Sequence, residues 1–159
     1  MTTKSLRFTR LLFSVIVLAV LTLVLVPAGF AKDPVDPVSK TDEGLALKGY
    51  DPVAYYKQGQ PVKGSAQYSR QWMQATWWFS SAENRDLFAA DPAKYAPQFG
   101  GYCAWAVSKN YTAPTDPEAW KIVDGKLYLN YNKDIQKKWE QDLAKRIEDA
   151  HKNWPDLHK

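Results

Sequence analysis

The chain has 159 residues, with 21 Lys and Arg against 17 Asp and Glu and a formal net charge of +4. Three of the 21 basic residues, Lys4, Arg7 and Arg10, lie within residues 1–31, which leaves 18 basic against 17 acidic residues in the remainder. This balance, with both signs interspersed, excludes an electrostatic footprint for nucleic acid or for an anionic membrane. The single cysteine, Cys103, excludes an intramolecular disulfide, so stability must come from burial, to which seven Trp and nine Tyr contribute.

Residues 1–31 are typical of an export signal. The three basic residues precede an apolar run from Leu11 to Val26, and small residues before Ala31 suit cleavage after that residue. The run is slightly short of the about 20 residues that span a bilayer. We therefore expect a cleaved signal and a periplasmic or otherwise exported protein. The alternative is an uncleaved N-terminal helix, which would then be the protein's contact with the membrane.

Residues 32–44 are rich in Pro, Asp and Lys and contain little to bury. That composition predicts a flexible spacer, followed by one folded domain over residues 45–159. The about 128 residues after the signal are enough for one domain with its own core.

Turn and strand signals dominate the first part of this domain. Asp51 and Pro52 predict a short helical start, with the carboxylate as its cap and the proline at the first helical position. Strands are predicted over residues 62–68 and 76–79, with a turn between them at residues 73–75.

Helix signals follow the second strand. Ser80 and Glu83 have the spacing of a capping box, which predicts that Ser80 caps a helix reaching about Ala90. The Asp-Pro pair at residues 91–92 starts another short helix, and the glycine pair at residues 100–101 ends it.

A hairpin and a helix are predicted at the C-terminal end. Asp124-Gly125 lies between strand-like runs at residues 120–123 and 126–130, the pattern of a hairpin with a type I′ turn. Asn132 then caps one long amphipathic helix, in which apolar residues recur every four positions. These residues are Ile135, Trp139, Leu143 and Ile147. The sequence therefore predicts an α+β fold of short hairpins and helices with a long C-terminal amphipathic helix.

The stretch from residue 79 to residue 95 resembles the YHS domain, a small module whose pattern is Phe-Cys-Ser-x-x-Cys, three residues, Phe, three residues, Pro-x-x-Tyr. Five anchor positions agree with that pattern: Phe79, Ser81, Phe88, Pro92 and Tyr95. The resemblance covers a core of about residues 50–97. The GGYCA stretch at residues 100–104 and the IVDGKLYLNYN stretch at residues 122–132 are similar to the exported, single-domain bacterial members.

The cysteines of that pattern are replaced in this chain. Ser80 and Asn84 stand at two cysteine positions, and Ala54 stands where Asp-Pro-Val-Cys would place a third. In relatives that retain them, the resemblance implies metal binding. A hydroxyl and an amide are weak ligands for zinc or copper(I), so we expect a structural site and no cofactor. The alternative is copper held by Cys103 with Met73 or His151.

Cys103 leaves three hypotheses open: a buried structural residue, a metal or redox contact, and a nucleophile. A nucleophilic thiol needs a neighbouring base, and the two histidines, His151 and His158, both lie at the C-terminal end. The acidic residues form no recognisable catalytic pair. We therefore expect a protein that is not an enzyme.

The remaining candidates are aromatic. Trp77 and Trp78 are adjacent on a predicted strand and point to opposite faces, so one of them can face a ligand. The candidate ligand-binding residues are Cys103, Trp105, Trp78 and Tyr102. We predict an exported binding module for a small molecule or an envelope protein, with no nucleic-acid partner. The alternative function is periplasmic copper handling through Cys103.

Overall fold

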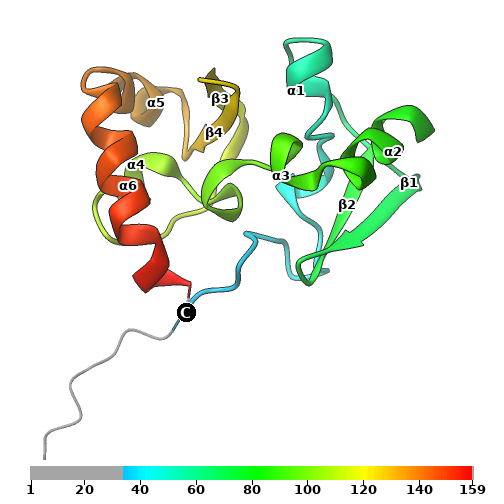
Figure 1. Ribbon diagram of the computed structural model, residues 1–159, viewed down its shortest axis with the longest axis horizontal. Coiled ribbons are helices and arrows are strands. Elements are labelled where there is room, and N and C mark those ends of the chain that lie inside the picture. Colours follow the sequence, from blue (N-terminus) through cyan, green and yellow to red (C-terminus); the bar gives the residue numbers. More distant parts are fainter. Residues whose placement is uncertain (1–33, 159) are drawn as a thin grey trace, which may run out of the picture. The chain divides into compact units, whose positions relative to one another are not determined.

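The computed structural model describes residues 34–158 (Figure 1), so the predicted signal at residues 1–31 lies outside the described residues. Across residues 34–158, no helix combines the length and apolar character needed to cross a membrane. The elements in chain order are η1 (Leu47–Gly49), α1 (Ala54–Lys57), β1 (Ser65–Trp72), β2 (Ala75–Phe79), α2 (Ala82–Ala90), α3 (Pro92–Tyr95), η2 (Gln98–Gly101), α4 (Ala104–Ser108), β3 (Asp116–Val123), β4 (Lys126–Asn130), α5 (Lys133–Glu140) and α6 (Leu143–Leu157). The predicted α+β class, with a long C-terminal helix, is confirmed.

The first core cluster lies under the antiparallel β1–β2 hairpin. Strand β2 alternates strictly, so Ala75, Trp77 and Phe79 are buried while the residues between them are half-buried. Phe88 of α2 lies 5.1 Å from the Trp77 ring and 5.2 Å from the Phe79 ring, measured between centroids. Burial of these aromatic rings stabilises the hairpin against α2.

The second core cluster lies between the antiparallel β3–β4 hairpin and the helices that follow it. Figure 1 shows α4, α5 and α6 gathered near this hairpin, with β1, β2 and α2 in the other half of the described chain. Tyr128 of β4 and Trp139 of α5 pack with their ring centroids 5.5 Å apart. Ala150 and Leu157 bury the inner face of α6 in the same cluster.

The segment of residues 34–44 is packed against the fold, so the prediction of a flexible spacer is wrong for these residues. The Val38 side chain is 2% exposed and belongs to the first core cluster. Ser39 N donates to the Gly100 carbonyl oxygen at 2.8 Å, and Val35 N donates to the Leu157 carbonyl oxygen at 2.9 Å. We call residues 34–41 the strap. The polar composition of the strap did not indicate that Val38 is buried or that the backbone N–H groups of Val35 and Ser39 are hydrogen-bonded.

Both hairpins turn through two residues with positive φ. Asp124 (φ 49°) and Gly125 (φ 72°) adopt the left-handed conformation that a type I′ turn requires, which confirms the predicted hairpin. Met73 (φ 46°) and Gln74 (φ 60°) do the same between β1 and β2, although neither is glycine. Strand β1 ends at Trp72, directly before this turn. It begins at Ser65, three residues later than predicted.

The C-terminal helix is two helices rather than one. Asn132 caps α5 as predicted, since its Oδ1 accepts from Ile135 N at 2.8 Å. The chain then leaves the helical conformation at Asp142 (φ −141°, ψ 52°), and α6 begins at Leu143. The break redirects the chain, so that Ala150 and Leu157 of α6 join the second core cluster. An apolar spacing of four continues across such a break, which is why the pattern predicted one helix.

Candidate functional site

The Asp51 carboxylate is the centre of a buried polar network. Asp51 is 0% exposed. Its Oδ1 accepts from the backbone N–H groups of Val53, at 2.8 Å, and Ala54, at 3.3 Å. Its Oδ2 accepts from Ser80 N at 2.8 Å, Ser80 Oγ at 2.7 Å and Asn84 Nδ2 at 2.7 Å. Five donors thus compensate the cost of burying one charge.

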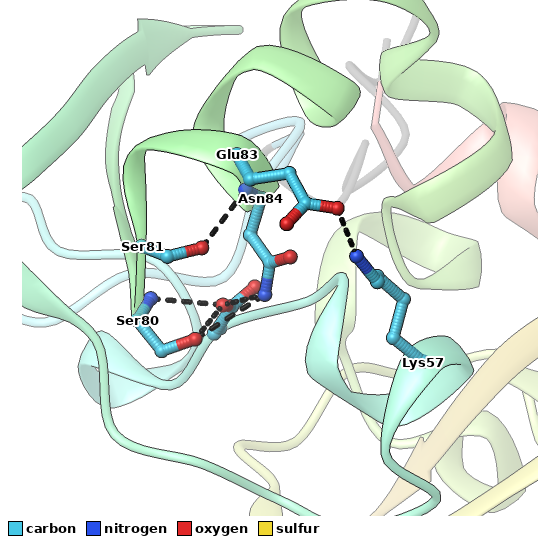
Figure 2. A network of polar contacts seen from close by, with 6 residues as sticks. Lys57, Ser80, Ser81, Glu83 and Asn84 are labelled. Atoms are coloured by element: carbon cyan, nitrogen blue, oxygen red, sulfur yellow. Dashed lines mark hydrogen bonds and ion pairs between the residues drawn. The ribbon is translucent and has the colours of Figure 1, made fainter.

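The fold brings together the three positions at which the YHS pattern has cysteine. Ala54, Ser80 and Asn84 each donate to the same carboxylate, and the side chains of Ser80 and Asn84 also contact each other at 3.2 Å. Figure 2 shows Ser80 and Asn84 side by side at the start of α2. Beside them, Lys57 of α1 forms an ion pair with Glu83.

Ser81, not Ser80, caps α2. The Ser81 Oγ accepts from Asn84 N at 3.1 Å, which is the cap interaction (Figure 2). The predicted capping box is therefore displaced by one residue, because the Ser80 hydroxyl donates to Asp51 instead. The network supplies hydrogen bonds that join α1 to α2, so its residues fit a structural role.

Cys103 lies at the start of α4, and the residue is 1% exposed. Tyr131 N donates to Cys103 Sγ at 3.3 Å, and the Asn130 Oδ1 lies 3.8 Å from the same sulfur. That Oδ1 also accepts from Trp105 N at 3.3 Å. Asn130 is 0% exposed, and its Nδ2 has no hydrogen-bond partner among residues 34–158.

An apolar pocket of about 210 Å³ opens above Cys103. It is lined by Cys103, Trp105, Ala106, Tyr111, Ala113, Tyr131 and Ile135. The Trp105 and Tyr111 rings meet edge to face at 6.4 Å, and the Lys109 Nζ lies 5.9 Å from the centre of the Trp105 ring. Tyr111 is 40% exposed and Tyr131 is 53% exposed. The pocket therefore has a thiol at its base and two partly exposed aromatic rings at its rim.

The surroundings of Cys103 favour the neutral thiol. Burial raises the pKa of the Cys103 thiol, and the neighbouring backbone N–H groups offset that rise only in part. His151 packs edge to face on Phe99 at 5.0 Å, and burial and then Lys126 lower the pKa of His151. His158 stacks on Trp154. Neither histidine is among the described residues that line the Cys103 pocket.

The candidate residues are divided among several places. Cys103 and Trp105 line the same pocket, whereas Trp78 packs near Gly49 and Tyr102 lies 5.9 Å from Trp154 between ring centroids. For the copper alternative, Met73 lines a different pocket from Cys103. Among residues 34–158, no three His, Cys, Asp or Glu side chains are grouped as metal ligands would be.

Sequence reasoning missed Tyr111, Tyr131 and Ile135 in this pocket. Tyr111 lies in the loop after α4, Tyr131 directly follows β4, and Ile135 belongs to α5, and no local motif marks them. The one available signal was that Tyr131 directly follows the predicted strand, in the same segment as Asn130.

We expect Cys103 to react with 5,5′-dithiobis(2-nitrobenzoate) on the order of a hundredfold more slowly in the native protein than after unfolding at neutral pH, because access and thiolate population are both reduced. The folded pKa is raised, so the stability that the neutral thiol contributes is present below the ordinary thiol pKa. That stability is lost as the pH rises through the raised value. Equal native and unfolded rates would instead favour the redox or nucleophile hypothesis.

Comparison of the chain with protein families, with curated proteins and with solved structures found no match.

Proposed function

We propose that this protein is an exported, non-enzymatic binding module of YHS-like design, and that its binding site is the pocket at Cys103. One observation carries the proposal. Tyr111 and Tyr131 are two of the three large hydrophobic side chains exposed among residues 34–158, and both line this apolar pocket. Exposed aromatic rings around a cavity favour binding, because an occupant removes their apolar surface from water.

The size of the pocket sets the size of its occupant. A volume of about 210 Å³ is below the about 300 Å³ at which sites for drug-sized ligands begin. One or two fused rings fit, whether they belong to a small molecule or to a side chain of an envelope protein. The raised pKa of Cys103 favours an occupant that contacts the thiol without reacting with it.

We expect single-ring and fused-ring probes, phenol and indole, to bind the full chain, and Tyr131→Ser to weaken their binding by about tenfold. The expected loss of roughly 1.4 kcal/mol corresponds to one aromatic contact. Ligand-observed NMR titration measures the dissociation constants. Met73→Ala is the matched control, because Met73 is the third exposed hydrophobic side chain and lies outside this pocket.

Binding that Tyr131→Ser weakens and Met73→Ala leaves unchanged supports the pocket as the site. If neither probe binds, or if both variants have the same effect, the proposal is wrong. Cys103→Ser is expected to retain binding, since the sulfur forms the base of the pocket rather than its aromatic rim.

A further inference from the structure

A second pocket, of about 160 Å³, lies where the strap, the β1–β2 turn and the end of α6 meet. Val38 of the strap, Trp72 and Met73 of the hairpin, and Trp154 and His158 at the C-terminal end all line it. None of these residues lines the Cys103 pocket, so an inference drawn from this second pocket goes beyond the proposed function.

The His158 imidazole is fixed in orientation. Its Nδ1 lies 2.6 Å from the Trp154 carbonyl oxygen, and its ring stacks on the Trp154 indole at 4.4 Å with an interplanar angle of 8°. A carbonyl oxygen only accepts, so Nδ1 carries the hydrogen and the lone pair of the neutral ring is on Nε2. Histidines that bind metals in proteins are commonly held in this way, with the other ring nitrogen bonded to a backbone carbonyl.

Met73 brings a soft donor to the same pocket. It lies in the turn between β1 and β2 and is 45% exposed. The chain has two methionines, and Met73 is the one within residues 34–158. A thioether is a weak ligand for hard cations and a good one for copper(I) and similar soft ions. Met73 and His158 both line this pocket, so a thioether sulfur and an imidazole nitrogen are available there as metal ligands. A hydrocarbon side chain in that turn would supply no such ligand.

The other walls favour a cation of low charge. Trp72, Trp77 and Trp154 contribute indole rings, and the residues lining this pocket include no carboxylate. Aromatic faces attract cations through the ring quadrupole, whereas divalent hard ions require several oxygen ligands. Neutral sulfur and nitrogen donors with aromatic walls suit a monovalent, soft d¹⁰ cation.

From this arrangement we infer that the second pocket is a binding site for a soft monovalent metal ion, copper(I) or its analogue silver(I), held by the Met73 thioether and His158 Nε2. The site is separate from Cys103 and from the Asp51 network. Its occupation would link the β1–β2 turn to the end of α6, two segments that are far apart in the sequence.

The test is titration of the full chain with silver(I) in chloride-free buffer, followed by isothermal calorimetry and by tryptophan fluorescence. The titrations use the Cys103→Ser background, so that the only thiol does not compete for silver. We expect one equivalent to bind and to quench fluorescence, and Met73→Leu and His158→Gln each to weaken binding by at least about tenfold. His151→Gln is the matched control and should leave binding unchanged, because His151 does not line this pocket.

Two measurements keep the outcomes distinct. The ¹³C methyl resonance of Met73 should shift on silver binding in the Cys103→Ser protein, and the melting temperatures of the variants report whether each one folds. Binding that survives both Met73→Leu and His158→Gln in folded protein overturns the inference. Loss of all silver binding in Cys103→Ser also overturns it, and would assign the metal to the thiol instead. Neither result bears on phenol or indole binding at the Cys103 pocket.

Discussion

Asp51→Asn is expected to destabilise the protein by about 3–5 kcal/mol, the cost of disrupting a buried, hydrogen-bonded charge. Each carboxylate oxygen accepts only from donors: two backbone N–H groups at Oδ1, and Ser80 and Asn84 at Oδ2. Whichever oxygen becomes an amide nitrogen, its hydrogens face other hydrogens. For a domain of this size the melting temperature should fall by roughly 10–15 °C.

The control for this substitution is Asp91→Asn. Asp91 is exposed and accepts from Lys94 N at 3.1 Å as the cap of α3. Asparagine is also a good cap, so the expected loss is a few tenths of a kcal/mol. Thermal and urea unfolding of both variants makes the comparison. Equal losses for the two variants would mean that the Asp51 network does not stabilise the fold.

Gly100→Ala is expected to detach the strap from Gly100 and to lower the free energy of unfolding by about 2–4 kcal/mol. A Cβ at Gly100 would lie 2.0 Å from the Pro37 carbonyl oxygen and 3.1 Å from the Val38 Cα, and the residue has a φ of 60°. Backbone atoms of the strap must therefore move, which breaks the hydrogen bond from Ser39 N to the Gly100 carbonyl oxygen. Amide hydrogen exchange at Ser39 should become faster, because this amide loses its hydrogen bond. Most of the lost free energy of unfolding should reappear in the exchange rate, at a factor of ten for every ~1.4 kcal/mol.

Gly59→Ala separates the clash from the backbone strain. Gly59 has a φ of 64°, close to that of Gly100, but a Cβ there would meet nothing within 4 Å. Gly59→Ala is expected to lower the free energy of unfolding by about 1–2 kcal/mol, the cost of placing an L-residue in the left-handed conformation. Amide hydrogen exchange at Ser39 should not change. If Gly100→Ala costs no more than Gly59→Ala, the strap does not depend on this close approach.

Local chemistry in the sequence predicted those parts of the fold that depend on neighbouring residues. The Asp124-Gly125 turn and the Asn132 cap each involve atoms within a few residues of one another, and both were predicted correctly. The break at Asp142 was missed, because the apolar spacing from Trp139 to Leu143 is the same in one helix or two. The buried Val38 was missed because a single apolar residue in a polar segment gives no periodic signal.

The site was predictable only in part, for the same reason. The spacing of Ser80 and Asn84 indicated that they share one side of a helix, but their partner Asp51 is 29 and 33 residues away. The sequence predicted that Asp51 caps a helix with Pro52 at its first position, whereas α1 begins at Ala54 and Asp51 Oδ1 accepts from Val53 N and Ala54 N. Its bonds to Ser80 and Asn84 depend on tertiary packing. Cys103 and Trp105 were chosen from one short motif. The motif does not contain the other large aromatic and apolar residues of their pocket: Tyr111 after α4, Tyr131 after β4 and Ile135 of α5.

The hydrogen bond from Val35 N to the Leu157 carbonyl oxygen places the first and last described segments of the fold in contact. A linker of a few residues is therefore long enough to join them. The exposed turn around Gly59 lies between α1 and β1, which makes it a suitable place to open the chain. Such a circular permutant would keep both hairpins and every helix intact while changing which half leaves the ribosome first. We therefore expect the contacts between the elements to form even when the elements follow one another in a different order along the chain.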